Sequence, residues 1–251
     1  MDHDGIEAVL LDLDGVITPT AEKHMQAWNR MFTGYFAERG LEPYSDEDYF
    51  RYIDGKPRDE GIVSMLAARD LTLPMGDEKK DDDDKAAADL ALTDTVTGLG
   101  ERKNAVFRQL LDEGIEAYPG SVAYLDALDA AGIAKCVVSS SKNAVAVLTA
   151  AGLRDRFEVI VDGEVAAAEG IPGKPRPDTY LRGAELLGVP ADRCVVVEDA
   201  VSGVQAGAAG GFARVVGVDR GAGKQVLLDA GADVVVVDLA ELIPDPTEAR
   251  A

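Results

Sequence analysis

The chain has 251 residues, of which 47% are hydrophobic and 28% are charged, which is enough to bury one large domain or a domain with an insert. Its formal net charge of -21 disfavours nucleic acid and anionic membrane surfaces as partners. An anionic substrate would need local positive charge from Lys, Arg or a metal ion.

Residues 1–5 lack the basic and apolar pattern of a secretory signal, and no apolar run reaches the roughly 18 residues of a membrane span. Cys136 and Cys194 each open an apolar run, so we expect buried thiols rather than a disulfide. These features predict a cytoplasmic protein without a membrane partner.

Short apolar runs rich in β-branched residues predict strands that are buried on both faces. They lie at residues 8–11, 136–138, 159–161, 194–197, 215–216 and 234–237. Helical patterns at 122–131, 143–151 and 179–187 lie between them, each followed by a glycine suited to a left-handed cap. Alternating strands and helices predict an α/β fold with a doubly wound parallel sheet.

One region interrupts this alternation. Residues 21–113 show helical patterns at 21–39, 57–69 and 101–111 but no buried strand. Residues 73–100 read as weakly structured, and the acidic block 81–85 as a solvated loop. We therefore expect an α/β core from residues 1–20 and 114–251, with an inserted helical cap of residues 21–113.

Two carboxylates, Asp12 and Asp14, follow the first predicted strand, where ligands bind in parallel sheets. Their i, i+2 spacing on extended chain places both side chains on one side. Such a pair can serve as nucleophile or metal ligand and as proton donor and acceptor. Gly15 then allows a sharp turn. The alternative is an Asp-rich turn that caps a helix.

Other predicted strands and loops end in polar groups as well. Ser139 to Asn143 can form an anion site at a helix start, and Glu198 with Asp199 suits a hard cation such as magnesium. Two prolines flank Arg176 and restrict the loop that carries Lys174. Taken singly, these residues also fit helix caps and a solvated lysine.

Together these motifs resemble the haloacid dehalogenase superfamily over the whole chain. The resemblance implies a Rossmann-like core and a helical cap that excludes water, with Asp12 as nucleophile and Asp14 as general acid/base. It also implies that the transferring phosphate is bound by Ser139, Ser140 and Lys174. The implied Mg²⁺ site consists of Asp12, Asp14, Glu198 and Asp199.

Within the superfamily, residues 12–28 resemble the β-phosphoglucomutase family. This closer resemblance implies sugar-phosphate contacts for Thr20, His24, Arg58, Lys103, Ser141, Lys142 and Asn143. Arg58 and Lys142 would hold the phosphate that is not being transferred. Pro19 departs from the family, which commonly has an acidic residue there, and the cap is longer.

The resemblance therefore predicts an isomerase that interconverts β-D-glucose 1-phosphate and glucose 6-phosphate, with β-glucose 1,6-bisphosphate as activating intermediate. A magnesium-dependent sugar-phosphate phosphatase and a non-catalytic phosphosugar-binding protein stand as alternatives. The expected partner is a small phosphorylated sugar, and the expected oligomeric state is a monomer.

Overall fold

A computed structural model describes residues 5–53, 58–76 and 84–244. The chain divides into two compact units. We call Met1–Thr20 with Gly114–Ala251 the core unit, and Ala21–Glu113 the inserted unit. Within the described residues no helix is long and apolar enough to span a membrane.

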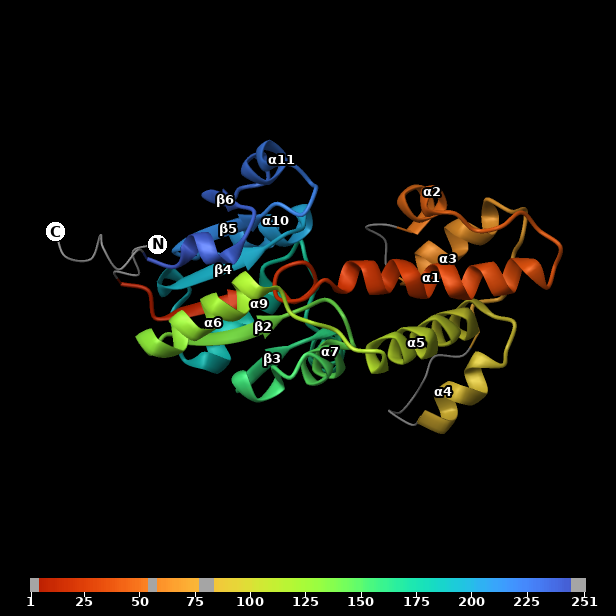
Figure 1. Ribbon diagram of the computed structural model, residues 1–251, viewed down its shortest axis with the longest axis horizontal. Helices are drawn as coiled ribbons and strands as arrows, with labels where there is room; N and C mark the ends of the chain where they lie inside the picture. Colours follow the sequence, from red (N-terminus) through yellow and green to blue (C-terminus); the bar gives the residue numbers. More distant parts are fainter. Residues whose placement is uncertain (1–4, 54–57, 77–83, 245–251) are drawn as a thin grey trace. The chain divides into compact units, whose positions relative to one another are not determined.

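The core unit is built on a six-stranded sheet in which every neighbouring pair is parallel. Its order is β3-β2-β1-β4-β5-β6 (Figure 1). The strands are β1 Ala8–Leu11, β2 Ala134–Val138, β3 Val159–Val161, β4 Cys194–Glu198, β5 Arg214–Val218 and β6 Val234–Val236. The predicted doubly wound α/β fold is confirmed.

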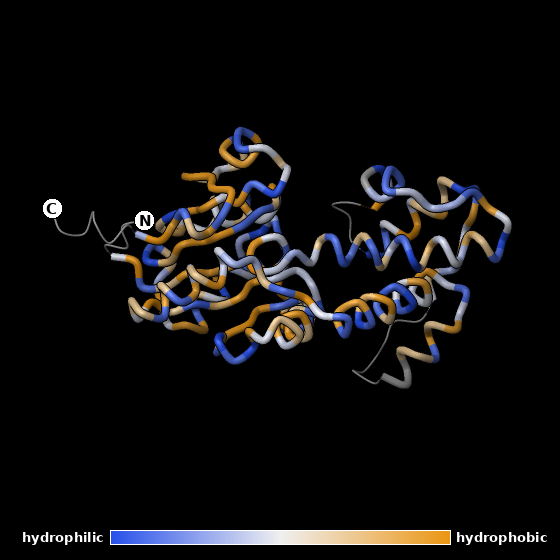
Figure 2. The backbone as a smooth tube through the Cα atoms, in the orientation of Figure 1, coloured by the Kyte–Doolittle hydropathy of each residue, from blue (hydrophilic) through white to orange (hydrophobic). Residues whose placement is uncertain are grey.

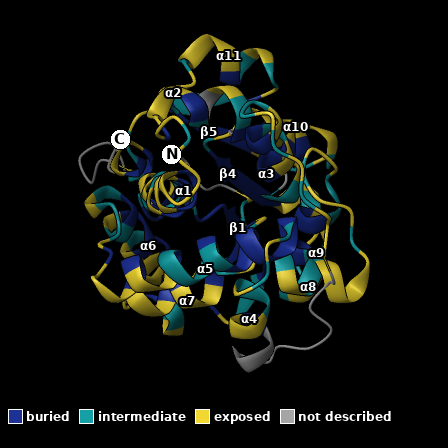
Figure 3. Cartoon of the chain, turned by 90° about the vertical axis from the view of Figure 1, so that its right-hand side faces the viewer, coloured by how far each residue is buried: buried dark blue, intermediate teal, exposed yellow. Residues whose placement is uncertain are grey.

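Both faces of the central strands are buried, which explains their unbroken apolar sequences. On one face Leu10, Cys136 and Val196 join a single core cluster against which α9 and α10 pack. Their neighbours Val9 and Leu11 point to the other face and are also fully buried. Figure 2 shows these strands as apolar, and Figure 3 shows them as buried.

Helices connect the strands of the core unit and cover its sheet. They are α6 Pro119–Ala131, α7 Ala144–Ala150, α8 Gly163–Glu169, α9 Asp178–Leu187, α10 Val201–Ala209 and α11 Lys224–Asp229, with short 3₁₀ turns at η2 Arg154–Arg156, η3 Ala191–Arg193 and η4 Leu239–Leu242. Gly132 and Gly188 end α6 and α9 in the left-handed conformation, as expected. Both cysteines are buried and free, also as expected.

Among the described residues of the inserted unit, all regular secondary structure is helical. It comprises α1 Thr20–Ala37, α2 Asp46–Asp48, the π-helical turn η1 Tyr49–Ile53, α3 Arg58–Ala67, α4 Asp84–Ala91 and α5 Val96–Asp112. Trp28, Phe32 and Phe36 recur every four residues on α1 and stack in sequence. This aromatic stripe packs with residues of α3 and α5 to form a separate hydrophobic core.

The prediction that residues 73–100 are weakly structured was wrong for residues 84–91 and 96–100, which are helical. Helix α4 begins at Asp84, inside the supposed acidic loop, and α5 begins at Val96 instead of 101. Residues 81–83, and Pro57 of the predicted 57–69 helix, lie outside the described residues.

The early start of α5 has a tertiary cause. Thr95 caps the helix by accepting a hydrogen bond from the Gly98 N–H at 2.9 Å, and the Pro74 carbonyl accepts one from the Val96 N–H at 3.0 Å. Gly98 and Gly100 look like helix breakers in the sequence. Here they allow close packing, since a Cβ on Gly98 would lie 2.3 Å from the Thr93 carbonyl oxygen.

Candidate active site

The site begins where β1 ends, between β2 and β4. The strand register pairs Leu11 with Val137 and with Val197, so the next residue, Asp12, enters the row that contains Glu198. The Asp12 N–H donates to the Val197 carbonyl at 2.9 Å. Because the strand order changes direction at β1, this edge of the sheet is the position where ligands bind in such folds.

Gly15 brings the loop after Asp14 against Asp199. Its φ of +83° is left-handed, and a Cβ there would lie 1.9 Å from the Asp199 Oδ2. The loop closes with the Gly15 N–H donating to the Thr18 carbonyl at 2.8 Å. A residue with a side chain therefore cannot stand at position 15 without displacing Asp199.

Lys174 lies at the centre of the charged groups. Its Nζ donates to Asp12 Oδ1 at 2.5 Å, to Glu198 Oε1 at 2.7 Å and to the Val138 carbonyl at 3.0 Å. The Lys174 side chain is 6% exposed, and those of Asp12 and Glu198 are 9% and 2% exposed. Lys174 is therefore buried in the site. The alternative, a solvated loop lysine, is wrong.

Burial and mutual repulsion dominate the electrostatics. Burial raises the pKa of Asp12 well above its usual range, and Glu198, Asp14 and Asp199 raise it further while Lys174 opposes them. Burial, followed by Glu198 and Asp14, raises the pKa of Asp199 to about 8. Burial would lower the pKa of Lys174, but Asp12 and Glu198 outweigh it and hold that pKa well above its ordinary value.

The donor atoms fit a hard divalent cation. Asp12, Asp14 and Asp199 offer oxygen ligands of the kind that Mg²⁺ takes, and they lie close enough for their charges to repel one another. Within the described residues no group of three or more His, Cys, Asp or Glu side chains is arranged to hold a metal by itself.

Glu198, expected near the cation, is occupied by protein donors. Its Oε1 accepts from Lys174 and its Oε2 from the Ala200 N–H at 2.7 Å. Gly203 makes room for it, because a Cβ there would lie 1.7 Å from Oε1. These contacts indicate that Glu198 positions Lys174. They fit a direct metal ligand less well, because both carboxylate oxygens already accept hydrogen bonds from the protein.

The residues after β2 form a connected turn. Ser139 Oγ donates to Asp14 Oδ2 at 3.3 Å and accepts from the Ser141 N–H at 3.0 Å. Ser141 Oγ in turn accepts from the Asn143 N–H at 3.1 Å. Ser140 is exposed, and Lys142 forms an exposed ion pair with Glu164 at 3.5 Å. Of these residues, Ser139 is the one that contacts a carboxylate of the site, that of Asp14.

In the inserted unit, His24 and Lys103 are in contact. Lys103 Nζ lies 2.6 Å from His24 Nδ1, and the imidazole stacks on Phe107 with centroids 4.1 Å apart. Burial, and then the Lys103 charge, lower the pKa of His24 well below its usual value. The ring is therefore neutral at physiological pH, with Nδ1 as acceptor and the proton on Nε2.

Arg58 has carboxylate partners that sequence reasoning missed. Its Nη1 donates to Glu101 Oε1 at 3.0 Å and its Nε to Asp59 Oδ1 at 3.0 Å. The Glu101 side chain is only 8% exposed. Gly100 accommodates the guanidinium, since a Cβ there would lie 2.8 Å from Arg58 Nε. No local sequence pattern predicts this pairing, because Arg58 and Glu101 lie 43 positions apart.

Tyr180 on α9 was also missed. Its fully buried ring lies 4.9 Å from Lys174 Nζ, which is a cation–π distance. Thr20, predicted to contact substrate, is fully buried, and its hydroxyl lies 3.2 Å from that of Thr18.

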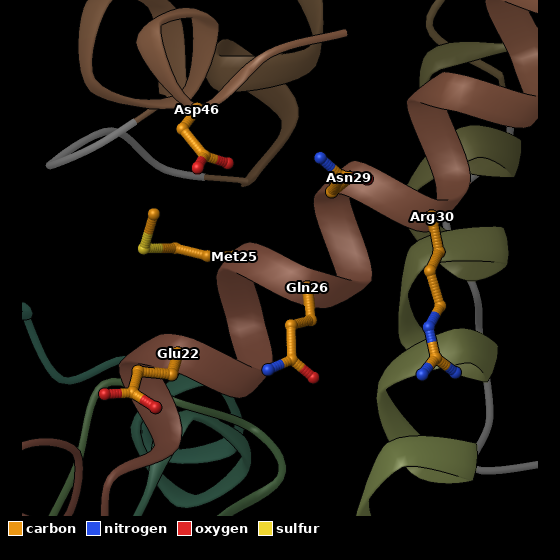
Figure 4. Close-up of a pocket in the computed structure, with 6 residues that line it drawn as sticks. All are labelled: Glu22, Met25, Gln26, Asn29, Arg30 and Asp46. Atoms are coloured by element: carbon orange, nitrogen blue, oxygen red, sulfur yellow. The ribbon is translucent and has the colours of Figure 1, made fainter.

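The inserted unit also carries an open pocket of about 380 Å³ (Figure 4). It is lined by Glu22, Met25, Gln26, Asn29, Arg30 and Asp46. None of the predicted site residues lines it, so we do not assign the chemistry to this pocket.

A family model described as haloacid dehalogenase-like hydrolase matches residues 6–211. The chain therefore belongs to the haloacid dehalogenase superfamily, among its β-phosphoglucomutase-like members, and it is an enzyme.

The similarity to particular proteins extends over nearly the whole chain. A β-phosphoglucomutase of Mycobacterium tuberculosis is 48% identical over 250 residues, covering 95% of this chain and 92% of that protein. A phosphorylated carbohydrates phosphatase of Thermotoga maritima is 30% identical, covering 92% and 94%. The structure of CbbY from Rhodobacter sphaeroides in complex with xylulose-(1,5)bisphosphate matches with a TM-score of 0.70 and 27% identity, covering 94% and 96%.

The first prediction concerns His24. Its NMR signals, recorded in a His3→Gln background that leaves one histidine, should not titrate near the ordinary pKa of about 6.5. Because the unfolded state binds the proton first, stability should fall as the pH drops below about 6.5, by up to about 1.4 kcal/mol per pH unit. Lys103→Met should move the pKa back upward. A His24 that titrates normally in the folded protein would contradict this assignment.

The second prediction concerns the buried charges. Lys174→Met leaves Asp12 and Glu198 facing each other, and it should lower the free energy of unfolding in EDTA by about 3–5 kcal/mol and abolish activity. Adding Glu198→Gln should restore much of the stability but not the activity. The exposed Lys224→Met is the control and should change stability by less than about 0.5 kcal/mol. Equal urea midpoints for Lys174→Met and wild type would rule out this charge balance.

Proposed function

We propose that this enzyme is a magnesium-dependent β-phosphoglucomutase that interconverts β-D-glucose 1-phosphate and glucose 6-phosphate. The observation that carries the proposal is the buried Asp12 carboxylate, bound by Lys174 at the ligand-binding edge of a parallel sheet. The 48% identity to a mycobacterial β-phosphoglucomutase supports the mutase over other activities of the superfamily.

Asp12 is the nucleophile in this proposal. Its Oδ1 is held by the Lys174 ammonium, which leaves the other oxygen to attack phosphorus and form an aspartyl-phosphate. Lys174 stays charged because its pKa is raised, and it offsets the repulsion between the carboxylate and the phosphate oxygens. Glu198 and Tyr180 keep the ammonium in place.

Asp12, the backbone carbonyl of Asp14 and Asp199 would hold the magnesium ion. When bound, the ion neutralises the clustered carboxylates and the phosphate oxygens. Glu198 acts through Lys174, because both of its oxygens already accept hydrogen bonds from protein donors.

Asp14 handles the proton. The 6-hydroxyl of β-glucose 1-phosphate attacks phospho-Asp12, its proton passes to Asp14, and the bond between phosphorus and Asp12 breaks to give β-glucose 1,6-bisphosphate. After the bisphosphate turns over, Asp12 takes the phosphoryl group from carbon 1 while Asp14 returns the proton to that oxygen, leaving glucose 6-phosphate. Ser139, which donates to Asp14 Oδ2, orients the carboxyl group for both steps.

A mutase has to bind two phosphates, so it needs a second anion site. We assign Arg58 and Lys142 to it, with Lys103 and His24 contacting the sugar and Ser141 and Asn143 contributing polar groups, while Ser139, Ser140 and Lys174 bind the transferring phosphate. Both cations form ion pairs with carboxylates, Arg58 with Glu101 and Lys142 with Glu164. A phosphate that binds to Arg58 or Lys142 therefore has to displace the carboxylate with which that cation is paired. This exchange favours a dianionic group over a weaker anion.

The second candidate is a sugar-phosphate phosphatase. The similarity to a phosphorylated carbohydrates phosphatase supports it, as does the hydrolase name of the matching family. Asp12, Asp14 and Lys174 would serve both reactions, which differ in whether water or a sugar hydroxyl attacks phospho-Asp12.

The third prediction separates these two activities. The enzyme, supplied with β-glucose 1-phosphate, Mg²⁺ and a trace of β-glucose 1,6-bisphosphate, should produce glucose 6-phosphate without matching free phosphate. A coupled dehydrogenase assay and a phosphate-release assay on the same sample measure both products. Asp12→Asn should abolish both signals. Free phosphate without glucose 6-phosphate would identify a phosphatase and reject the mutase.

The fourth prediction tests the second anion site. Arg58→Ala removes charge-assisted hydrogen bonds worth about 1.5–3 kcal/mol, so KM for β-glucose 1-phosphate should rise about 10- to 100-fold. Glu101→Gln removes one of the two carboxylate partners of Arg58 and should lower KM. Arg30→Ala is the matched control, since Arg30 is a half-exposed arginine of the same unit paired with Glu113. Unchanged KM in Arg58→Ala would remove Arg58 from the substrate site.

A further inference from the structure

Arg220 lies in the loop after β5 and reaches the loop that carries the catalytic carboxylates. Its Nε donates to the Gly15 carbonyl at 2.7 Å, and its Nη1 donates to the Val237 carbonyl at 3.0 Å. The guanidinium carbon lies 3.8 Å from the centre of the Tyr118 ring. One side chain thus joins the nucleophile loop to the end of β6 and to the start of α6.

The carbonyl of Gly15 is the first of three successive carbonyls that are held in the same way. The Val16 carbonyl accepts from Ser121 Oγ at 2.7 Å, and the Ile17 carbonyl accepts from the Tyr118 N–H at 3.0 Å. Tyr118 and Ser121 lie at the start of α6, on which the Arg220 guanidinium also stacks. The donors therefore form one framework around the loop, and Arg220 supplies its charged member.

The orientation of the Gly15 peptide matters for the site because Gly15 is left-handed and lies against Asp199. A rotation of this peptide would shift the part of the loop that packs against Asp199. This segment lies outside the named helices and strands, since β1 ends at Leu11 and α1 begins at Thr20, and an isolated bridge joins Asp14 to Thr18. The hydrogen bond from Arg220 adds a constraint on the Gly15 carbonyl, while the Gly15 N–H is held by the Thr18 carbonyl.

We propose that Arg220 is a positioning residue for phosphoryl transfer, which fixes the Gly15 peptide and through it the spacing of Asp14 and Asp199. The inference rests on the proposed aspartyl-phosphate chemistry but not on the choice between mutase and phosphatase. Neither the motif residues nor the cap residues include Arg220.

The guanidinium shape is required for this role. Its planar fork donates to two carbonyls on different segments while its face stacks on an aromatic ring. A lysine carries the same charge as a single ammonium and cannot make these three contacts in one geometry. Arg220→Lys therefore keeps the positive charge but loses the combined contacts that position the loop.

The experiment compares wild type, Arg220→Lys and Arg220→Ala. In Arg220→Lys, kcat should fall about 10- to 100-fold, as expected for misplaced catalytic groups, while KM for the sugar phosphate stays within about two-fold. The Mg²⁺ concentration needed to form the Asp12 beryllofluoride adduct, followed by ¹⁹F NMR, should rise as well. Millimolar guanidinium should restore part of the activity of Arg220→Ala.

Arg214→Lys is the matched control, because Arg214 is an exposed arginine on β5, and it should behave as wild type. A wild-type kcat and Mg²⁺ dependence in Arg220→Lys would overturn the proposal. The proposal would also be overturned if the urea midpoint of Arg220→Lys fell while its folded fraction kept the full kcat. Such a result would mean that Arg220 stabilises the fold and has no part in catalysis.

Three further outcomes decide between the proposed chemistry and the positioning role. If Arg220→Lys does not fold, the wild-type Arg220 Nε–H signal carries the test: it should shift when Mg²⁺ and beryllofluoride bind, and an unchanged signal overturns the proposal. If wild type forms no adduct at Asp12, the proposed chemistry fails and this inference fails with it. Adduct formation that Arg220→Lys leaves unaltered rejects the positioning role alone.

Discussion

The site depends on one buried ammonium group among several carboxylates. Lys174 contacts Asp12 and Glu198 directly, and these three side chains are almost completely shielded from water. Burying carboxylates so close together is costly unless a cation compensates them. Burial is the main cause of the raised pKa values of Asp12 and Asp199, and the neighbouring carboxylates raise them further. In the proposed function, a bound divalent cation would stabilise these carboxylates in their charged form.

The parallel sheet brings these charges together. Asp12, Ser139 and Glu198 are far apart in sequence but lie at or just beyond the ends of adjacent strands, and the strand register places them in neighbouring rows. Lys174 reaches them from the loop before α9. The apolar residues on both faces exclude water beneath the site, and this strengthens every charge interaction above it.

Sequence patterns predicted the strands and the core motifs because each has a local cause. Buried parallel strands require continuous β-branched runs, and the carboxylates directly follow them. The start of α5 could not be predicted in this way. Its glycines oppose a helix locally, and the contacts that favour it come from Thr95, Pro74 and the packing of Gly98 against Thr93. Those contacts exist only once the inserted unit has folded.

The sequence by itself determined the α/β core, its helical insert and the identity of the charged residues at the sheet edge, because strand periodicity and motif spacing are local properties. Only the tertiary structure decided the partners: Glu198 with Lys174, Glu101 with Arg58, and Arg220 with the Gly15 carbonyl. Each pair joins residues 24 or more positions apart. Their meeting is a consequence of packing and chain topology, which no local pattern encodes.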